Sequence, residues 1–282
     1  MASYKVKLIA AMALVLITAR QAPAYNRIIS LYSGHTDNII ALGGESHLIA
    51  VSKNDEPSRL ENLPHIAPKS SAEVFIALKP DLVIMRTFNA KQNPELAGVL
   101  NRASIEVKLI DPPSWNNFEK YLYDLAPLID EDPSAAAKQF STVCDSLKSE
   151  VEKRKSGAAP KVFVEATAKE LHTCAPDSWA AHLIALCGGE NAAESAVPNR
   201  KESAIAPWGL ERTIATAADG LDVYIVQQGP MNRSTIDDIT SRSWYSILKN
   251  VNIVQIPEYE LSRPSLLGLK NGGKKLIDVF YP

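Results

Sequence analysis

The chain repeats one sequence pattern in its two halves. IALGGE (residues 40–45) precedes EVFIALKPDLVIM (73–85), and IALCGGE (184–190) precedes ERTIATAADGLDVYIV (211–226). The spacing Glu-x-x-Ile-Ala-x-x-x-Asp begins at Glu73 and again at Glu211. Two similar halves predict two similar lobes, and a cleft between lobes is a common place for a ligand.

Short β-rich runs alternate with helical patterns along the chain. The runs are residues 27–31, 48–51, 81–85 and 107–110 in the first half, and 161–166, 222–226 and 252–256 in the second. Such alternation is typical of βαβ units. We therefore expect an α/β fold with two similar lobes, each built on a mainly parallel sheet.

A long helical pattern separates the halves. It starts with Asp132 as the N-cap and Pro133 at the first helical position, and it continues to about Ser156. We expect one long helix that joins the lobes and limits hinge motion. The predicted boundaries are residues 1–24 for a signal peptide, 25–131 for the N-terminal lobe, 132–158 for the bridging helix and 159–282 for the C-terminal lobe. Residues 270–282 are expected to form a terminal helix and tail.

The first residues have the composition of a secretory signal. Lys5 and Lys7 precede an apolar run over residues 8–19, and Ala22-Pro23-Ala24 supplies small residues for a peptidase. The run has about 12 residues, whereas a membrane-spanning helix needs about 20. We expect cleavage after Ala24 and export to the periplasm. The alternative, an uncleaved anchor, is disfavoured by Arg20 and the short run.

The charge of the chain limits the kinds of binding partner, and its cysteine content limits the possible disulfides. The net charge is −2, without blocks of like charge, which disfavours nucleic acid as a partner. Three cysteines, Cys144, Cys174 and Cys187, cannot form a full set of disulfides. Because Cys174 and Cys187 flank a predicted helix, their separation exceeds disulfide reach. We expect mostly buried, free thiols.

Ligands of parallel sheets bind beyond the carboxyl ends of the strands, so the loops there hold the candidate binding residues. The candidates are Tyr32, His35, Arg86, Asn89, His172, Trp179, Trp208, Gln228 and Arg263. His35 and His172 could bind a metal from opposite lobes, and the arginines could bind anionic oxygen atoms. The tryptophans could stack on a ligand. The alternatives remain open: a capping histidine, a structural ion pair and core packing.

Motifs of catalysis are missing. There is no G-x-S-x-G, H-E-x-x-H or C-x-x-C pattern, so we expect neither an enzyme nor a resident cofactor.

Glu73 and Glu211 each open a predicted helix, where the helix dipole favours a carboxylate. Because they occupy equivalent places in two lobes, they could also dock a symmetric partner that offers two basic residues.

The segments ALKPDLVI and CGGEN, together with the arrangement of both halves, resemble the periplasmic binding proteins of ABC importers for metal chelates: ferric siderophores, haem and cobalamin. The resemblance covers nearly all of residues 27–282. It implies two α/β lobes bridged by one helix, a ligand between the lobes, and docking of Glu73 and Glu211 on arginines of a permease dimer. The family's cobalamin-binding aromatic positions are not clearly matched, because IAPKSSAE contains no tryptophan before Glu73.

The leading expectation is therefore a non-enzymatic, monomeric periplasmic receptor that binds a metal chelate, in the first place a ferric siderophore, and delivers it to a permease dimer. Haem, cobalamin and a bare transition-metal ion are the alternatives within this class. A secreted α/β enzyme with His35 or His172 as general base, and an adaptor with an empty cleft and an acidic docking face, are the alternatives outside it.

Overall fold

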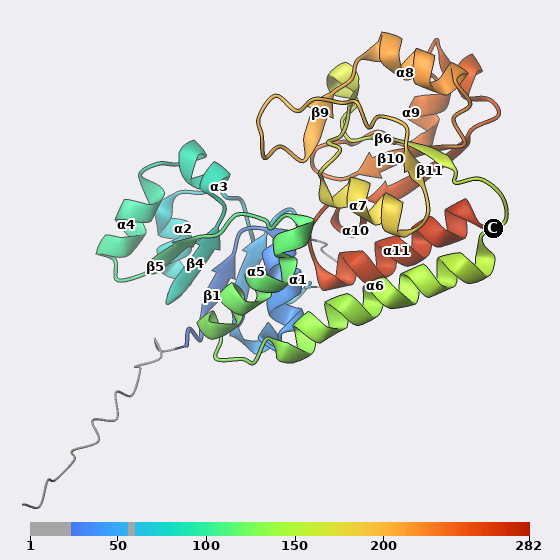
Figure 1. Cartoon of the computed structure of the whole chain (residues 1–282). Helices are drawn as coiled ribbons and strands as arrows, with labels where there is room; N and C mark the ends of the chain where they lie inside the picture. The colour runs from blue at the N-terminus through green and yellow to red at the C-terminus, as the bar shows by residue number, and fades with distance from the viewer. Residues whose placement is uncertain (1–23, 56–59) are drawn as a thin grey trace, which may run out of the picture.

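The computed structural model describes residues 24–55 and 60–282, so the predicted signal segment lies outside the described residues except for Ala24. The described chain forms two α/β lobes with a long helix along both of them (Figure 1). This confirms the predicted fold class.

The N-terminal lobe is built on a five-stranded parallel sheet in the order β3-β2-β1-β4-β5. Its strands are β1 Ile28–Ser30, β2 Leu48–Ser52, β3 His65–Ile66, β4 Leu82–Met85 and β5 Glu106–Leu109. Alternate residues of β1 and β4 face opposite sides: Ile28 and Leu82 join one apolar cluster, whereas Ile29 and Val83 join another. A sheet buried on both faces explains why these strands are continuously apolar.

The C-terminal lobe is built on a parallel sheet in the order β11-β10-β6-β8. Its strands are β6 Lys161–Glu165, β8 Glu190–Asn191, β10 Val223–Gln228 and β11 Asn252–Pro257. A separate antiparallel pair joins β7 His172–Cys174 to β9 Ile205–Pro207. The order β8-β6-β10-β11 matches β2-β1-β4-β5 of the first lobe, so the doubled sequence pattern corresponds to a doubled topology.

The repeated Gly-Gly-Glu segments are equivalent turns. Gly43, after the first helix of its lobe, has φ +93°, and Gly188, in the matching place, has φ +82°. Both values lie in the left-handed region that glycine adopts without strain. A Cβ atom on Gly44 would lie 2.5 Å from Ile129, and one on Gly189 would lie 2.7 Å from Phe280. In each turn the first glycine therefore supplies the conformation and the second permits close packing.

Helices cover both faces of each sheet. They are α1 Ser33–Ala41, α2 Ala72–Ala77, α3 Thr87–Gln92, α4 Leu96–Arg102, α5 Phe118–Leu125, α6 Ser134–Arg154, α7 Trp179–Leu186, α8 Leu210–Ala218, α9 Ile236–Thr240, α10 Glu258–Leu261 and α11 Leu266–Phe280. Residues of α1, α5, α6, α7 and α11 share one apolar cluster with both sheets. Helices α2 and α4 cover the other face of the first sheet, and α8 and α9 that of the second.

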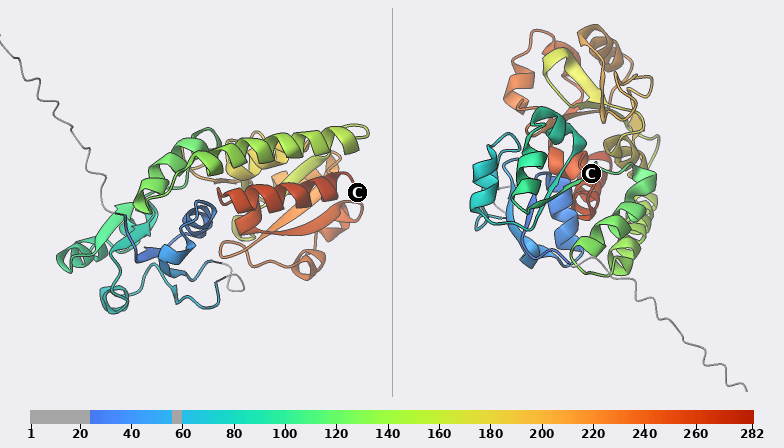
Figure 2. Two further views of the ribbon diagram at one scale, coloured as in Figure 1. Left: turned by 90° about the horizontal axis from the view of Figure 1, so that it is seen from below. Right: turned by 90° about the vertical axis from the view of Figure 1, so that its left-hand side faces the viewer.

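Helix α6 bridges the lobes. Its 21 residues extend about 31 Å, and it lies beside α11 (Figure 2). A Cβ atom on Gly273 of α11 would lie 2.5 Å from Leu147 of α6, so the two helices are in close contact there. Because the apolar cluster is continuous across both lobes, it favours a fixed lobe arrangement.

The starts of two helices differ from the prediction. Helix α6 begins at Ser134, whose backbone N donates to Asp132 Oδ1 at 2.9 Å, so Pro133 precedes the helix. The terminal helix begins at Leu266, not Lys270, because the side chain of Ser265 caps it by accepting from Gly268 N.

The three cysteines are free, as predicted. Within residues 24–55 and 60–282, no helix is both long and apolar enough to cross a membrane.

Candidate functional site

A hollow of about 290 Å³ lies between the lobes. The N-terminal lobe contributes Lys53, Asn54 and Asp55, which follow β2. The C-terminal lobe contributes residues at the ends of β10 and β11 and beyond, among them Gln228, Pro230, Glu258, Tyr259 and Arg263. The hollow thus lies at the carboxyl ends of strands from both sheets, where parallel sheets bind ligands. We call it the cleft.

Two arginines from opposite lobes approach one tyrosine ring beside the cleft. The Arg86 guanidinium carbon lies 4.8 Å from the centre of the Tyr32 ring, and that of Arg263 lies 5.2 Å from it. Arg263 also donates to Glu258 Oε1 at 2.8 Å. Burial lowers the pKa of Arg86, and the charge of Arg263 acts in the same direction. Two cations held together in this way favour an anion between or beside them.

Several buried polar atoms in this region have no hydrogen-bond partner among the described residues. They are Ser33 Oγ, Asp55 Oδ2, Arg86 Nε and both amide atoms of Gln227. Buried polar groups are nearly always paired in folded proteins. These atoms therefore retain hydrogen-bonding capacity for a polar ligand.

Asp55 lines the cleft, and the pKa of its carboxyl group is raised. Burial raises its pKa to about 7, and the neighbouring charge of Asp37 adds to this effect. Thr36, Arg263 and the backbone of Ser52 act in the opposite direction. At neutral pH the cleft therefore contains a carboxyl group that is partly neutral, which lowers the negative charge beside Arg263.

His35 is a structural residue of the first lobe. It is fully buried, its Nδ1 lies 2.7 Å from Tyr121 Oη, and its Nε2 lies 2.9 Å from the carbonyl oxygen of Ile110. Since a carbonyl only accepts, Nε2 carries the proton and Nδ1 accepts from Tyr121. Burial lowers the pKa of His35 to about 4, which keeps the ring neutral. Both nitrogens are occupied, so the predicted metal-binding role is replaced by core hydrogen bonding.

His172 and Asn89 also have local partners. His172, the first residue of β7, is half-buried, and its Nδ1 lies 3.3 Å from the carbonyl oxygen of Lys169. Asn89 is buried, and its Oδ1 accepts from the backbone N of Arg86 at 3.3 Å, which helps to start α3. The described residues contain no group of three or more His, Cys, Asp or Glu side chains able to hold a metal. His35 and His172 thus do not belong to a preformed metal site there.

Both candidate tryptophans pack in cores. Trp179 is 4% exposed, and its ring centre lies 4.6 Å from that of Trp115 and 5.0 Å from that of Phe118. Trp208 is 9% exposed and lies under the Arg212 guanidinium at 3.5 Å. The alternative of core packing therefore describes both better than ligand stacking.

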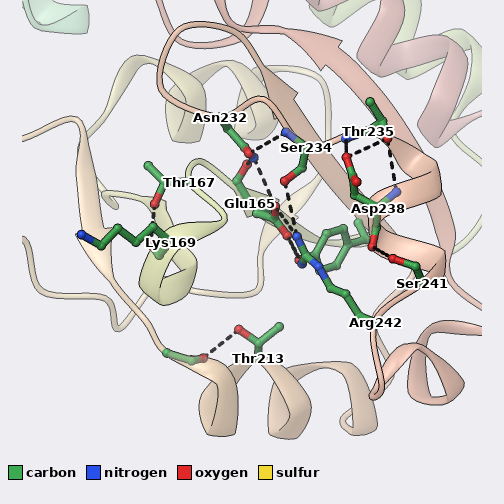
Figure 3. A network of polar contacts seen from close by, with 12 residues as sticks. Glu165, Thr167, Lys169, Thr213, Asn232, Ser234, Thr235, Asp238, Ser241 and Arg242 are labelled. Carbon is green, nitrogen blue, oxygen red and sulfur yellow. Dashed lines mark hydrogen bonds and ion pairs between the residues drawn. The ribbon is translucent and has the colours of Figure 1, made fainter.

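A second, open hollow of about 540 Å³ lies on the C-terminal lobe and shares Pro230 with the cleft. Its base rests on a polar network around Glu165, which is fully buried at the end of β6 (Figure 3). Arg242 donates to both carboxylate oxygens of Glu165, at 2.5 and 2.9 Å, and Tyr224 Oη also donates to this carboxylate. Asn232 Nδ2 adds hydrogen bonds to the backbone and side chain of Glu165.

Glu73 and Glu211 are exposed in the first turns of α2 and α8. These helices cover the sheet faces that lie opposite the shared core, one in each lobe (Figure 1). Apolar side chains beside them are exposed as well: Val74 by 43%, Ile76 by 37% and Leu210 by 44%. Each lobe thus presents a carboxylate with an apolar border to solvent.

The sequence prediction missed the loops after β2 and β11. Lys53, Asn54 and Asp55 follow the first of these strands, and Glu258 and Tyr259 follow the second. Ligands bind beyond the carboxyl ends of parallel strands, and this rule applies to the loops after β2 and β11 as it does to the predicted ones. Of the predicted residues, Gln228 and Arg263 line the cleft. The guanidinium groups of Arg86 and Arg263 both approach the ring of Tyr32, so Tyr32 and Arg86 lie beside the cleft.

No family model matches the chain. A vitamin B12-binding protein of Yersinia pestis (strain Pestoides F) is 30% identical over 198 residues, which cover 67% of this chain and 68% of that protein.

Solved structures show the same fold. A periplasmic haem-binding protein of Vibrio cholerae has a TM-score of 0.70 at 21% identity, covering 91% of this chain and 99% of that one. A protein of an ABC-type Fe³⁺-hydroxamate transport system from Saccharomonospora viridis DSM 43017 has a TM-score of 0.66 at 16% identity, covering 92% and 94%. This chain therefore shares the fold of both proteins over nearly its whole length.

Proposed function

The chain belongs to the family of periplasmic substrate-binding proteins of ABC importers that contains the vitamin B12-binding proteins, and from this premise we propose that it carries an anionic metal chelate, in the first place a ferric siderophore. The chelate binds in the cleft between the lobes and is delivered to an importer permease. The importer's ATPase supplies the energy of transport. The receptor binds and releases its ligand, and acts as a monomer.

The observation that carries the proposal is the pair Arg86 and Arg263 around Tyr32. Hydroxamate and catecholate groups bind Fe³⁺ through anionic oxygen atoms, and guanidinium groups form strong hydrogen bonds with such oxygens. Arg86 Nε has no partner within the described chain, so it can donate to a ligand without breaking a contact. Gln228 and Tyr259 supply further polar edges for the same ligand.

Cobalamin is a second candidate, favoured by the 30% identity with a vitamin B12-binding protein. It carries a phosphodiester, which suits the same positive charge. A bare metal ion has less support, because the described residues contain no cluster of metal-binding side chains and both nitrogens of His35 are occupied.

Glu73 and Glu211 support the delivery step. Their exposed carboxylates stand on equivalent helices of two similar lobes. Such a pair complements a two-fold symmetric partner that offers one basic residue in each half. We assign this docking role to both.

Purification from the periplasm without unfolding tests the proposal, because a tight ligand can remain bound. Absorbance and mass spectrometry of the released small molecules should reveal an iron chelate or a corrinoid in proportion to the protein. A protein that is ligand-free and also binds no ferric siderophore, haem or cobalamin on addition would contradict it.

A further inference from the structure

We propose that Lys169 and Arg233 form an anion subsite at the outer end of the cleft, which binds a peripheral carboxylate or phosphate of the chelate. The inference rests on the proposed function and extends it, because it predicts a ligand with an anionic group outside its metal centre. The subsite is the open hollow of about 540 Å³ on the C-terminal lobe.

The segment that carries Arg233 is fixed from below. Asn232 is 1% exposed, and its Nδ2 donates to the carbonyl and to Oε1 of Glu165 at 3.1 and 3.2 Å. Its Oδ1 accepts from the backbone N of Ser234, and its carbonyl accepts from Gly229 N. With Asn232 anchored, its neighbours Met231 and Arg233 are both exposed. The loop is therefore organised before any ligand arrives, which reduces the entropy lost on binding.

Two cations of this hollow have no partner among the residues that the structure describes. Within the described part of the chain, neither the Lys169 ammonium nor the Arg233 guanidinium forms an ion pair or a side-chain hydrogen bond. In Figure 3 the Lys169 side chain extends away from Glu165 and its network. By contrast, Lys161 at the other end of β6 is paired with Asp219 at 3.1 Å.

One carboxylate faces the same hollow and has to be counted. Asp238 lines it, and Asp238 Oδ2 accepts from the backbone N and from Oγ1 of Thr235, both at 2.8 Å. These hydrogen bonds lower the pKa of Asp238, so it remains charged. The hollow is therefore lined by two cations and by one carboxylate that is already hydrogen-bonded to Thr235, so its net charge is positive. Met231, 45% exposed, adds an apolar wall, so the chemistry suits an anionic group on an apolar arm.

The hollow adjoins the cleft. Pro230 lines both, and it lies between Gln228 and Gly229 of the cleft and Met231 of the hollow. A chelate whose metal centre lies beside Arg263 can therefore place a substituent on Lys169 and Arg233. A compact ligand without such a substituent would fill only the cleft.

The test uses ligand pairs that differ in one anionic group. The first pair is a ferric trihydroxamate with one free carboxylate and its methyl ester; the second is dicyanocobinamide phosphate and dicyanocobinamide, which lacks the phosphate. Affinities are measured for the full-length mature protein, for K169Q/R233Q and for the control K153Q/K155Q. The control removes the same charge from exposed positions at the far end of α6.

For whichever pair the wild-type protein binds, K169Q/R233Q should lose about 10-fold in affinity for the anionic member and keep its affinity for the other within about 2-fold. The control should change neither. Equal affinities of wild type and K169Q/R233Q for the anionic member would overturn the subsite and leave the proposed function standing. If the wild-type protein binds none of the four probes, the subsite is overturned. The proposed function fails as well only if the protein also binds no other ferric siderophore and no haem.

Discussion

Asn38 of α1 donates a hydrogen bond from Nδ2 to the carbonyl oxygen of Pro264 at 2.9 Å, and so links the first lobe to the segment that leads into α11. Asn38 Oδ1 also accepts from the backbone N of Leu266, and Nδ2 donates to the Gly34 carbonyl. Asn38 is fully buried. One side chain thus joins both lobes beside the cleft, in addition to the bridge made by α6.

Replacing this side chain should lower the stability of the whole molecule. Asn38→Ala removes three hydrogen bonds and leaves buried backbone groups unpaired, so the free energy of unfolding should fall by about 2–4 kcal/mol. Urea denaturation measures this. Asn101→Ala, at an exposed position on α4, should change it by less than about 0.5 kcal/mol. Equal effects of the two substitutions would contradict the linking role of Asn38.

Arg86→Gln should weaken chelate binding and leave the fold intact. Arg86 forms no ion pair among the described residues, so its loss leaves no buried charge without a partner. We expect the affinity for an anionic ferric chelate to fall by about 10- to 100-fold. Calorimetric titration measures it, with Arg102→Gln on the exposed end of α4 as control. An unchanged affinity would remove Arg86 from the site.

Asp55 should make binding depend on pH. Because burial raises its pKa to about 7, Asp55 gains a negative charge as the pH rises from 6 to 8, beside Arg263 and the carboxylate of Asp37. The affinity for an anionic chelate should therefore fall severalfold over this interval. Asp55→Asn should flatten the profile, and Glu95→Gln, at an exposed position, should not. A profile of the same slope in Asp55→Asn would refute this assignment.

His35 should make stability depend on pH in the acid range. The unfolded state takes up a proton below its ordinary pKa of 6.5, whereas the native state does so only near 4. The free energy of unfolding should thus fall as the pH drops from 6.5 to 4, by on the order of 3 kcal/mol. Asp55 acts oppositely, because its raised pKa stabilises the native state as the pH falls from 7 toward 3.8. The two proteins to compare are therefore the single variant Asp55→Asn and the double variant Asp55→Asn/His35→Gln. The fall in the free energy of unfolding between pH 6.5 and 4 should be present in the single variant and absent from the double variant. If the double variant shows the full fall, the fall does not originate in His35.

Charge reversal at the two docking residues should separate binding from uptake. In cells, Glu73→Arg/Glu211→Arg should reduce import by at least about 10-fold, while the purified variant binds its chelate as the wild type does. Glu95→Arg/Glu152→Arg reverses two other exposed carboxylates and should leave import unchanged. Normal import by the first variant would exclude the docking role.

The fold was largely predictable because its main strands lie in β-rich runs that alternate with helical patterns. All seven predicted strands are present, and their ends differ by at most two residues. The strands that the prediction missed, β3, β7, β8 and β9, have only two or three residues each. Such short strands have no recognisable period, so their pairing is set by tertiary contacts.

The candidate site was predictable only in part. The prediction named Tyr32, Arg86, Gln228 and Arg263, which lie in or beside the cleft, but residue type and sequence position did not reveal which side chains the core would enclose. His35 is held by Ile110 and Tyr121, 75 and 86 residues away in the sequence. Trp179 meets Trp115 and Phe118 from other elements in the same way. No local pattern contains these partners.

The central claim, a metal chelate bound beside Arg86 and Arg263, is tested most directly by calorimetric titration of the purified mature protein with ferric siderophores, haem and cyanocobalamin. The account predicts one-to-one binding of at least one of them with a Kd well below about 10 μM, and a clear loss of affinity in Arg86→Gln. If no chelate binds more tightly than about 10 μM, or if Arg86→Gln binds it as well as the wild type, the account is contradicted.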